Sequence, residues 1–102
     1  MQATLYLPGQ SPRTVSTEGL VLPDPATGCA AVPAVVPELL NCRPGLVDIL
    51  ACGPSYVVYS VFDCEDELNP LAMTVVANVT GVSFDLDDED AALCGAVLVV
   101  TE

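Results

Sequence analysis

The sequence predicts an all-β fold, a small antiparallel β-sandwich with a Pro-rich, irregular N-terminal arm or layer. Apolar and polar residues alternate in several short stretches, which is the period of a half-buried strand. Eight of the nine prolines lie at or before Pro54, where they limit regular strands to short pieces. A length of 102 residues with 52% hydrophobic content suffices for one domain. We therefore expect a single domain over 1–102, with the arm and short strands in 1–54 and regular antiparallel strands in 55–102.

The first half contains three candidate elements. Residues 3–7 alternate and predict a strand, which the following Pro-Gly pair ends in a turn. Residues 20–22 predict a second, short strand before a proline-rich turn. Residues 37–50 contain the segments PELLNC and LVDIL, separated by another Pro-Gly pair. Because proline interrupts helical hydrogen bonding, we expect single helical turns there at most.

The second half predicts longer strands. Residues 55–62 (SYVVYSVF) are the strongest strand candidate because β-branched and aromatic residues fill them. Residues 71–78 alternate and predict the next strand, which Gly81 ends. The acidic residues 87–93 predict one capped helical turn. Further strands are expected at 82–86 and at 96–101.

Two of these strands, 56–62 and 97–100, are apolar on both faces. An antiparallel strand of this kind either lies centrally in its own domain or presses against another chain. Two explanations for the second apolar face remain open: it is covered by a loop from the Pro-rich half, or by a second subunit. For the second case the expected interface residues are Tyr56, Val58, Tyr59, Val61, Val97, Val99, Arg13 and Arg43. The two arginines are the chain's only basic side chains, and we expect them in salt bridges to acids of the same or an adjacent subunit.

The charge balance excludes several functions. Fourteen acids face two arginines, with no lysine or histidine, and the net charge is −12. Two cations cannot neutralise a nucleic-acid backbone, and an anionic membrane surface is excluded for the same reason. Without histidine as a base or lysine as a nucleophile, we expect no enzyme, no catalytic residues and no cofactor. A binding or structural role is favoured.

Ten of the acids lie in residues 55–102, mostly in two clusters, 63–67 and 85–90. The weak calcium candidates are Asp85, Asp87, Asp88, Glu89 and Asp90. The run opening at Asp85 begins with EF-hand spacing, but Asp90 stands where the motif needs glycine and Ala96 where it needs glutamate. We therefore predict no metal site and prefer a solvated acidic surface. The same clusters could instead dock a basic patch on another protein.

The five cysteines are Cys29, Cys42, Cys52, Cys64 and Cys94. They contain no C-x-x-C pair, and no histidine can join them, so structural zinc is not expected. Buried thiols suit a cytoplasmic product, whereas disulfides suit a product that later meets an oxidising exterior, as a released virus particle does. The pairing stays open.

Targeting signals are not evident. Residues 1–20 lack the basic and apolar regions of a signal peptide, and prolines interrupt the best apolar stretch. We expect a product of the host cytoplasm with no membrane contact. The Asn78-Val79-Thr80 sequon is interpreted as part of a solvent-facing strand.

Residues 56–101 resemble the small Ig-like β-sandwich modules of structural proteins in tailed-bacteriophage virions. The resemblance lies in the order of parts: a strand ending in FDCEDELNPL, an alternating strand, a Gly turn, VSFDL, an acidic helical turn and the final strand GAVLVV. It implies an Ig-like fold and no catalytic residues. The Pro-rich first half departs from the pattern and fits an extended arm better.

The resulting expectation is a non-enzymatic virion protein, a capsid decoration or stabilisation (cement) protein that forms homo-oligomers and binds a major capsid or other virion protein. One alternative is a tail, baseplate or neck adaptor. Another is a Ca²⁺-dependent binding module on a bacterial surface.

Overall fold

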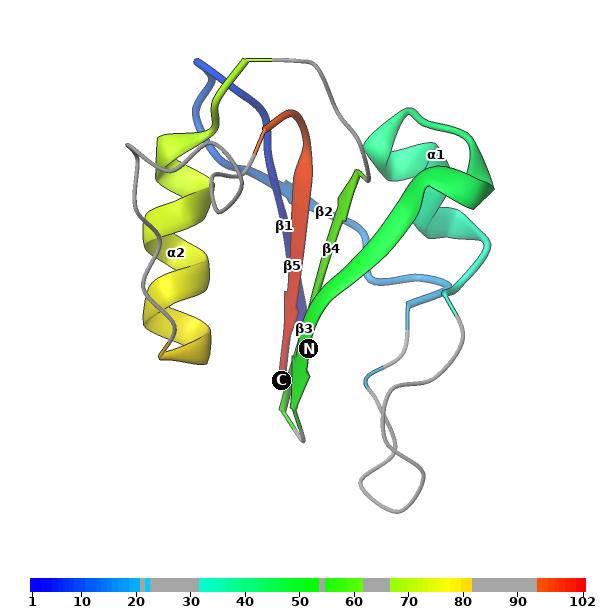
Figure 1. The fold of residues 1–102 in the computed structure, drawn as a ribbon. Coiled ribbons are helices and arrows are strands. Elements are labelled where there is room, and N and C mark those ends of the chain that lie inside the picture. The colour runs from blue at the N-terminus through cyan, green and yellow to red at the C-terminus, as the bar shows by residue number, and fades with distance from the viewer. Residues whose placement is uncertain (21, 23–31, 54, 62–66, 82–93) are drawn as a thin grey trace.

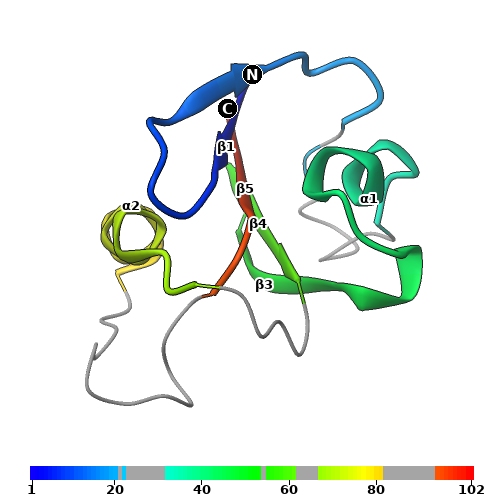
Figure 2. The ribbon, with the colours of Figure 1, turned by 90° about the horizontal axis from the view of Figure 1, so that it is seen from above.

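The computed structural model describes residues 1–20, 22, 32–53, 55–61, 67–81 and 94–102. They form one five-stranded antiparallel sheet with a helix on each face (Figures 1 and 2). The strand order is β2-β1-β5-β4-β3. In chain order the elements are β1 (Gln2–Tyr6), β2 (Arg13–Val15), α1 (Val35–Leu40), the 3₁₀ turn η1 (Pro44–Leu46), β3 (Val47–Gly53), β4 (Tyr56–Val61), α2 (Pro70–Thr80) and β5 (Val97–Thr101).

The first and last strands of the chain are neighbours inside the sheet. β1 pairs antiparallel with β5, from Gln2 opposite Thr101 to Tyr6 opposite Val97. β5 pairs on its other side with β4. The predicted strands at 3–7, 55–62 and 96–101 are therefore confirmed in β1, β4 and β5. The predicted turn after the first strand is confirmed by the hydrogen bond from Gln10 N–H to the Leu7 carbonyl, 3.1 Å.

Two apolar cores lie on opposite faces of the sheet. On the α1 face, the buried cluster combines sheet residues such as Leu5, Tyr59 and Leu98 with Val36 and Leu40 of α1. On the α2 face, a second cluster combines sheet and α2 residues: Tyr6, Val58, Val97, Val99, Ala72, Met73 and Val76. The central strands β4 and β5 are apolar on both sides because each side meets a helix of the same chain (Figure 2).

The prediction of a strand over 71–78 is wrong, because these residues form α2. The Asn69 side chain caps the helix, Pro70 occupies its first turn, and Gly81 ends it with a left-handed φ of 76°. Ala72, Met73 and Val76 are buried at helical spacing. The alternating β-branched residues favoured a strand, but capping and burial of one helical face outweigh that preference.

The interpretation of residues 37–50 is half right. PELLNC contributes to the short helix α1, as expected, but LVDIL lies in η1 and the edge strand β3. Leu20 and Leu22 lie outside any strand, and Leu20 is buried in the α1-face core. β2 was not expected.

The antiparallel, mostly sheet architecture is confirmed, and the described part of the chain forms one sheet covered by helices. The first half supplies β1, β2, β3 and α1 to this same structure. The strand predicted at 82–86 and the helical turn predicted at 87–93 fall on residues that the structure does not describe.

Candidate functional site

The sheet has two different edges. β2, at one edge, has three residues, includes Arg13 and follows directly after Pro12. β3, at the other edge, has seven residues, of which all except Asp48 are uncharged and partly buried. An edge strand presents a row of backbone N–H and C=O groups that can pair with another strand. Because β3 is the longer and more apolar edge, it is the better candidate for an interaction surface.

A β-bulge divides β3 at Leu50. Ile49 lies opposite Tyr59 of β4, whereas Ala51 lies opposite Val58, so Leu50 is an additional residue in the ladder. The additional residue reverses the faces of the residues that follow it. As a result Cys52 lies opposite Val57 and packs on the α1 face, while Leu50 packs against the α2-face core.

The described cysteines fall into two chemical states. Cys52 is disulfide-bonded. Cys42, just after α1, and Cys94, just before β5, carry thiols and are partly buried. Cys42 and Cys52 both pack against the α1-face core. Cys29 and Cys64 lie outside the described residues.

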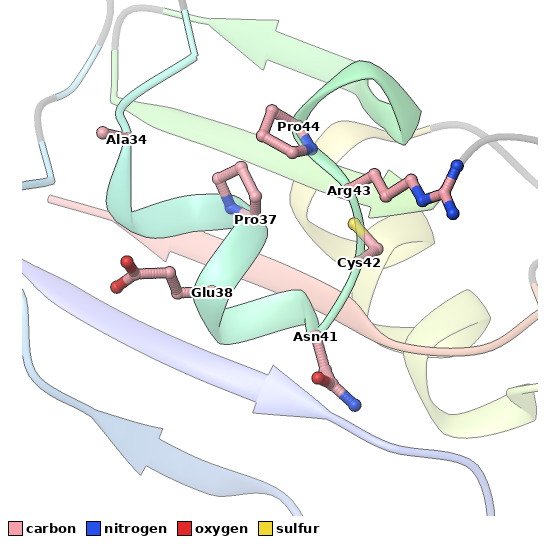
Figure 3. A pocket seen from close by; sticks show the side chains of 7 residues that line it. All are labelled: Ala34, Pro37, Glu38, Asn41, Cys42, Arg43 and Pro44. Atoms are coloured by element: carbon pink, nitrogen blue, oxygen red, sulfur yellow. The ribbon is translucent and has the colours of Figure 1, made fainter.

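A hollow of about 420 Å³ lies at the C-terminal end of α1 (Figure 3), lined by Ala34, Pro37, Glu38, Asn41, Cys42, Arg43 and Pro44. The rings of Pro37 and Pro44 form apolar walls, and Asn41 turns the chain with a left-handed φ of 54°. In Figure 3 the side chains of Glu38, Asn41 and Arg43 point in three different directions. Binding sites for small molecules need polar groups that converge on the ligand, so this hollow does not define one.

A buried polar junction holds α2 to the sheet. Asn69, 2% exposed, donates through Nδ2 to the carbonyls of Tyr6 (3.0 Å) and Gly95 (2.8 Å). Its Oδ1 accepts from Ala72 N–H at 3.4 Å. Asn69 is not among the residues predicted from the sequence, although an asparagine directly before proline and an apolar run is a helix-start signal.

The predicted interface residues are brought together, but mostly inside the chain. Val58, Val97 and Val99 are buried beneath α2, and Tyr59 is buried in the α1-face core. In this conformation these four side chains are not accessible to a second subunit. Tyr56 and Val61 are partly buried, and the two arginines are exposed on different elements: Arg13 on β2 and Arg43 before η1. The salt bridges expected for the arginines stay a prediction.

Burial also affects one titratable group. Tyr59 is 3% exposed, and its desolvation raises the pKa of the phenol above the ordinary value of 10.0. Its role is to fill the α1-face core from the centre of β4.

The calcium candidates at 85–90 lie outside the described residues. Within the described ranges, no group of three or more His, Cys, Asp or Glu residues is arranged to hold a metal ion. No helix in the described part of the chain is both long enough and apolar enough to cross a membrane. The sequon residue Asn78 is exposed on α2, not on a strand.

Comparison of the chain with protein-family models, with curated proteins and with solved structures finds no match.

Proposed function

We propose that this chain is a non-enzymatic structural protein of a tailed-bacteriophage virion, which decorates and stabilises the capsid as a homo-oligomer bound to a shell protein. Protein–protein contacts of this kind require buried area and complementary shape rather than a catalytic constellation. A small sheet packed on both faces supplies a rigid body, and the absence of lysine and histidine from the sequence favours binding over catalysis.

The observation that carries the proposal is the disulfide at Cys52. Disulfides persist in oxidising surroundings and are rare in the reducing cytoplasm. A protein that is made in a host cytoplasm and then stays on a released particle meets such surroundings. The disulfide at Cys52 therefore supports a location on the outside of a released particle.

The charge distribution supports the same proposal. With fourteen acids and two arginines, the chain repels other acidic surfaces and is attracted to basic ones. The attraction would guide the acidic clusters of the sequence, at 63–67 and 85–90, towards a basic patch on the shell, while apolar contacts would hold the bound subunit. The Ig-like sandwich is implied by the resemblance alone. The described residues supply a single sheet, and α2 replaces one of the strands on which the resemblance depends.

The experiment first asks whether a major capsid protein is encoded beside the gene of this chain. The purified chain is then added to capsid shells assembled from that protein. We expect the chain to sediment with the shells and to raise the temperature at which they release their contents. The chain reduced and alkylated at its cysteines is the matched control for the disulfide. A chain that stays in the supernatant at micromolar concentration would contradict decoration.

The same preparation separates the two alternatives. Binding to isolated tails or necks instead of shells would favour an adaptor. Thermal melts with Ca²⁺ and with a chelator test the surface-binding module, which predicts a large upward shift in Tm because ligand binding stabilises the folded state.

A further inference from the structure

We infer that α2 detaches from the sheet and unfolds as one unit, while the sheet and the core on its α1 face stay folded. Detachment uncovers the apolar residues that the sheet contributes to the α2-face core: Tyr6, Val58, Val97 and Val99. The last three of these are residues that the sequence predicts for an interface with another chain. Detachment is a property of the chain alone, so it goes beyond the proposed function and does not depend on binding to a capsid.

The helix α2 has little stability of its own. It has eleven residues, and isolated helices of this length are marginal in water. None of its side chains is charged, so it gains nothing from ion pairs along the helix or from charges in its first and last turns. Its β-branched residues, which have a low helix propensity, are Thr74, Val75, Val76, Val79 and Thr80. The helical state of α2 therefore depends on its packing against the sheet.

The two faces of the sheet are held unequally. Among the described residues, the α1-face core has ten buried members and the α2-face core has seven. Cys52, which packs against the α1-face core, is disulfide-bonded. The buried residues that α2 contributes to its own core are Ala72, Met73 and Val76. Because the stabilisation from packing grows with the apolar area buried, separating α2 from the sheet costs less free energy than unfolding the whole chain.

The polar junction at Asn69 fixes where α2 lies but adds little to the cost of detachment. Its Nδ2 donates to the carbonyls of Tyr6 at 3.0 Å and of Gly95 at 2.8 Å. When α2 detaches, water replaces each partner, so the net contribution of these hydrogen bonds is small. Few buried apolar residues and one polar junction are typical of a segment that opens before the rest of a protein.

The experiment is native-state hydrogen exchange of the purified, oxidised chain, followed by NMR at several low urea concentrations. The measured quantity is the equilibrium constant for opening at each amide. We expect the amides of residues 74–80 to share one opening constant, at least about tenfold larger than that of the central amides of β4 and β5. It should rise with urea, because detachment exposes apolar surface, whereas fraying of helix ends exposes little.

Two results with the wild-type chain would overturn the inference. If the opening constant of α2 equals that of β4 and β5, α2 opens only when the whole chain unfolds. If the exchange of α2 does not depend on urea, the helix frays residue by residue and does not detach as one unit.

A matched pair of valines on the two helices gives an independent test. Val36 of α1 and Val76 of α2 are 0% and 1% exposed, and each lies in the core on its own face of the sheet. Val76→Ala weakens the packing of α2, so it should raise the opening constants of α2 and of the strands by the same factor, about fivefold or more. Far-UV circular dichroism checks that both variants are folded.

The expected result of Val36→Ala is different. This substitution weakens the α1-face core, which is intact both before and after α2 detaches. It should raise the opening constant of β4 and β5 about fivefold or more, and that of α2 by a factor at least about threefold smaller. Equal factors for α2 and the strands in this variant would show that α2 is not a separate unit.

Discussion

The Nδ2 group of Asn69 donates a hydrogen bond of 2.8 Å to the carbonyl oxygen of Gly95. This bond joins the residue that begins α2 to the residue that leads into β5, across 26 positions of sequence. The second Nδ2 bond, to Tyr6, adds the end of β1. One buried amide therefore sets where α2 lies on the sheet, and the covering of β4 and β5 depends on it.

Asn69→Asp should lower the free energy of unfolding by about 3–5 kcal/mol, because a buried carboxylate would face two carbonyl oxygens and donate to neither. Equilibrium urea unfolding measures this loss. The loss should shrink as the pH falls towards about 4, where protonation removes the added charge. Asn69→Ser, which keeps an oxygen for the helix cap, is the control for the two donated bonds. An Asn69→Asp variant as stable as the wild type would show that the junction is not formed.

The packing of α2 can be tested with two adjacent residues. Met73 is buried in the α2-face core, whereas Thr74 on the same helix is exposed. Met73→Ala should lower the free energy of unfolding by about 2–4 kcal/mol because it leaves a cavity. Thr74→Ala should change it by less than about 1 kcal/mol. Equal effects at the two positions would contradict a helix that packs this face against the sheet.

The buried phenol of Tyr59 predicts a loss of stability at alkaline pH. Its pKa is raised in the folded protein, so between the ordinary value of 10.0 and the raised value the unfolded chain ionises while the folded chain stays protonated. The contribution of the protonated Tyr59 phenol to the free energy of unfolding is therefore fully present below pH 10.0. It is lost as the pH rises through the pKa of the folded protein. Urea titrations at several alkaline pH values measure the slope of the free energy of unfolding against pH.

Tyr59→Phe should make that slope shallower, since it removes the phenol. Tyr56→Phe is the control, because Tyr56 lies on the same strand and is already partly exposed. The explanation fails if the two variants alter the alkaline slope equally.

The cysteines predict a specific thiol count. The chain has five, Cys52 is in a disulfide, and Cys42 and Cys94 carry thiols. Mass spectrometry after alkylation in denaturant without reductant should therefore find three labelled cysteines, and five with reductant. Cys94→Ser should reduce the first count to two, whereas Cys52→Ser should raise it to four because it releases the partner. A wild-type count of five without reductant would remove the main support for an external location.

Part of the fold can be predicted from short segments of the sequence. The strands at 55–62 and 96–101 and the turn after the first strand follow from residue type and period, because each signal lies within a few residues. The two-sided apolar character of β4 and β5 was also visible, but its cause was not. Whether that second face meets a helix, a loop or another chain depends on contacts between distant segments.

The same limit explains the errors. Residues 71–80 are rich in β-branched side chains, and their helical state depends on the cap from Asn69 and on a sheet face that other segments build. The bulge at Leu50 shows up only in the pairing with β4, although it decides on which face Cys52 lies. The place of β3 at an edge of the described sheet can be recognised only when the strand order is known.

The sequence by itself determined the acidic charge and the presence of strands at the two ends of its regular β pattern, 55–62 and 96–101, because these depend on composition and short-range pattern. Only the tertiary structure decided that helices cover both faces of the sheet, that the two terminal strands are neighbours and that β3 is an edge. These features depend on long-range packing, in which the energy gained at one residue depends on segments far away in the chain.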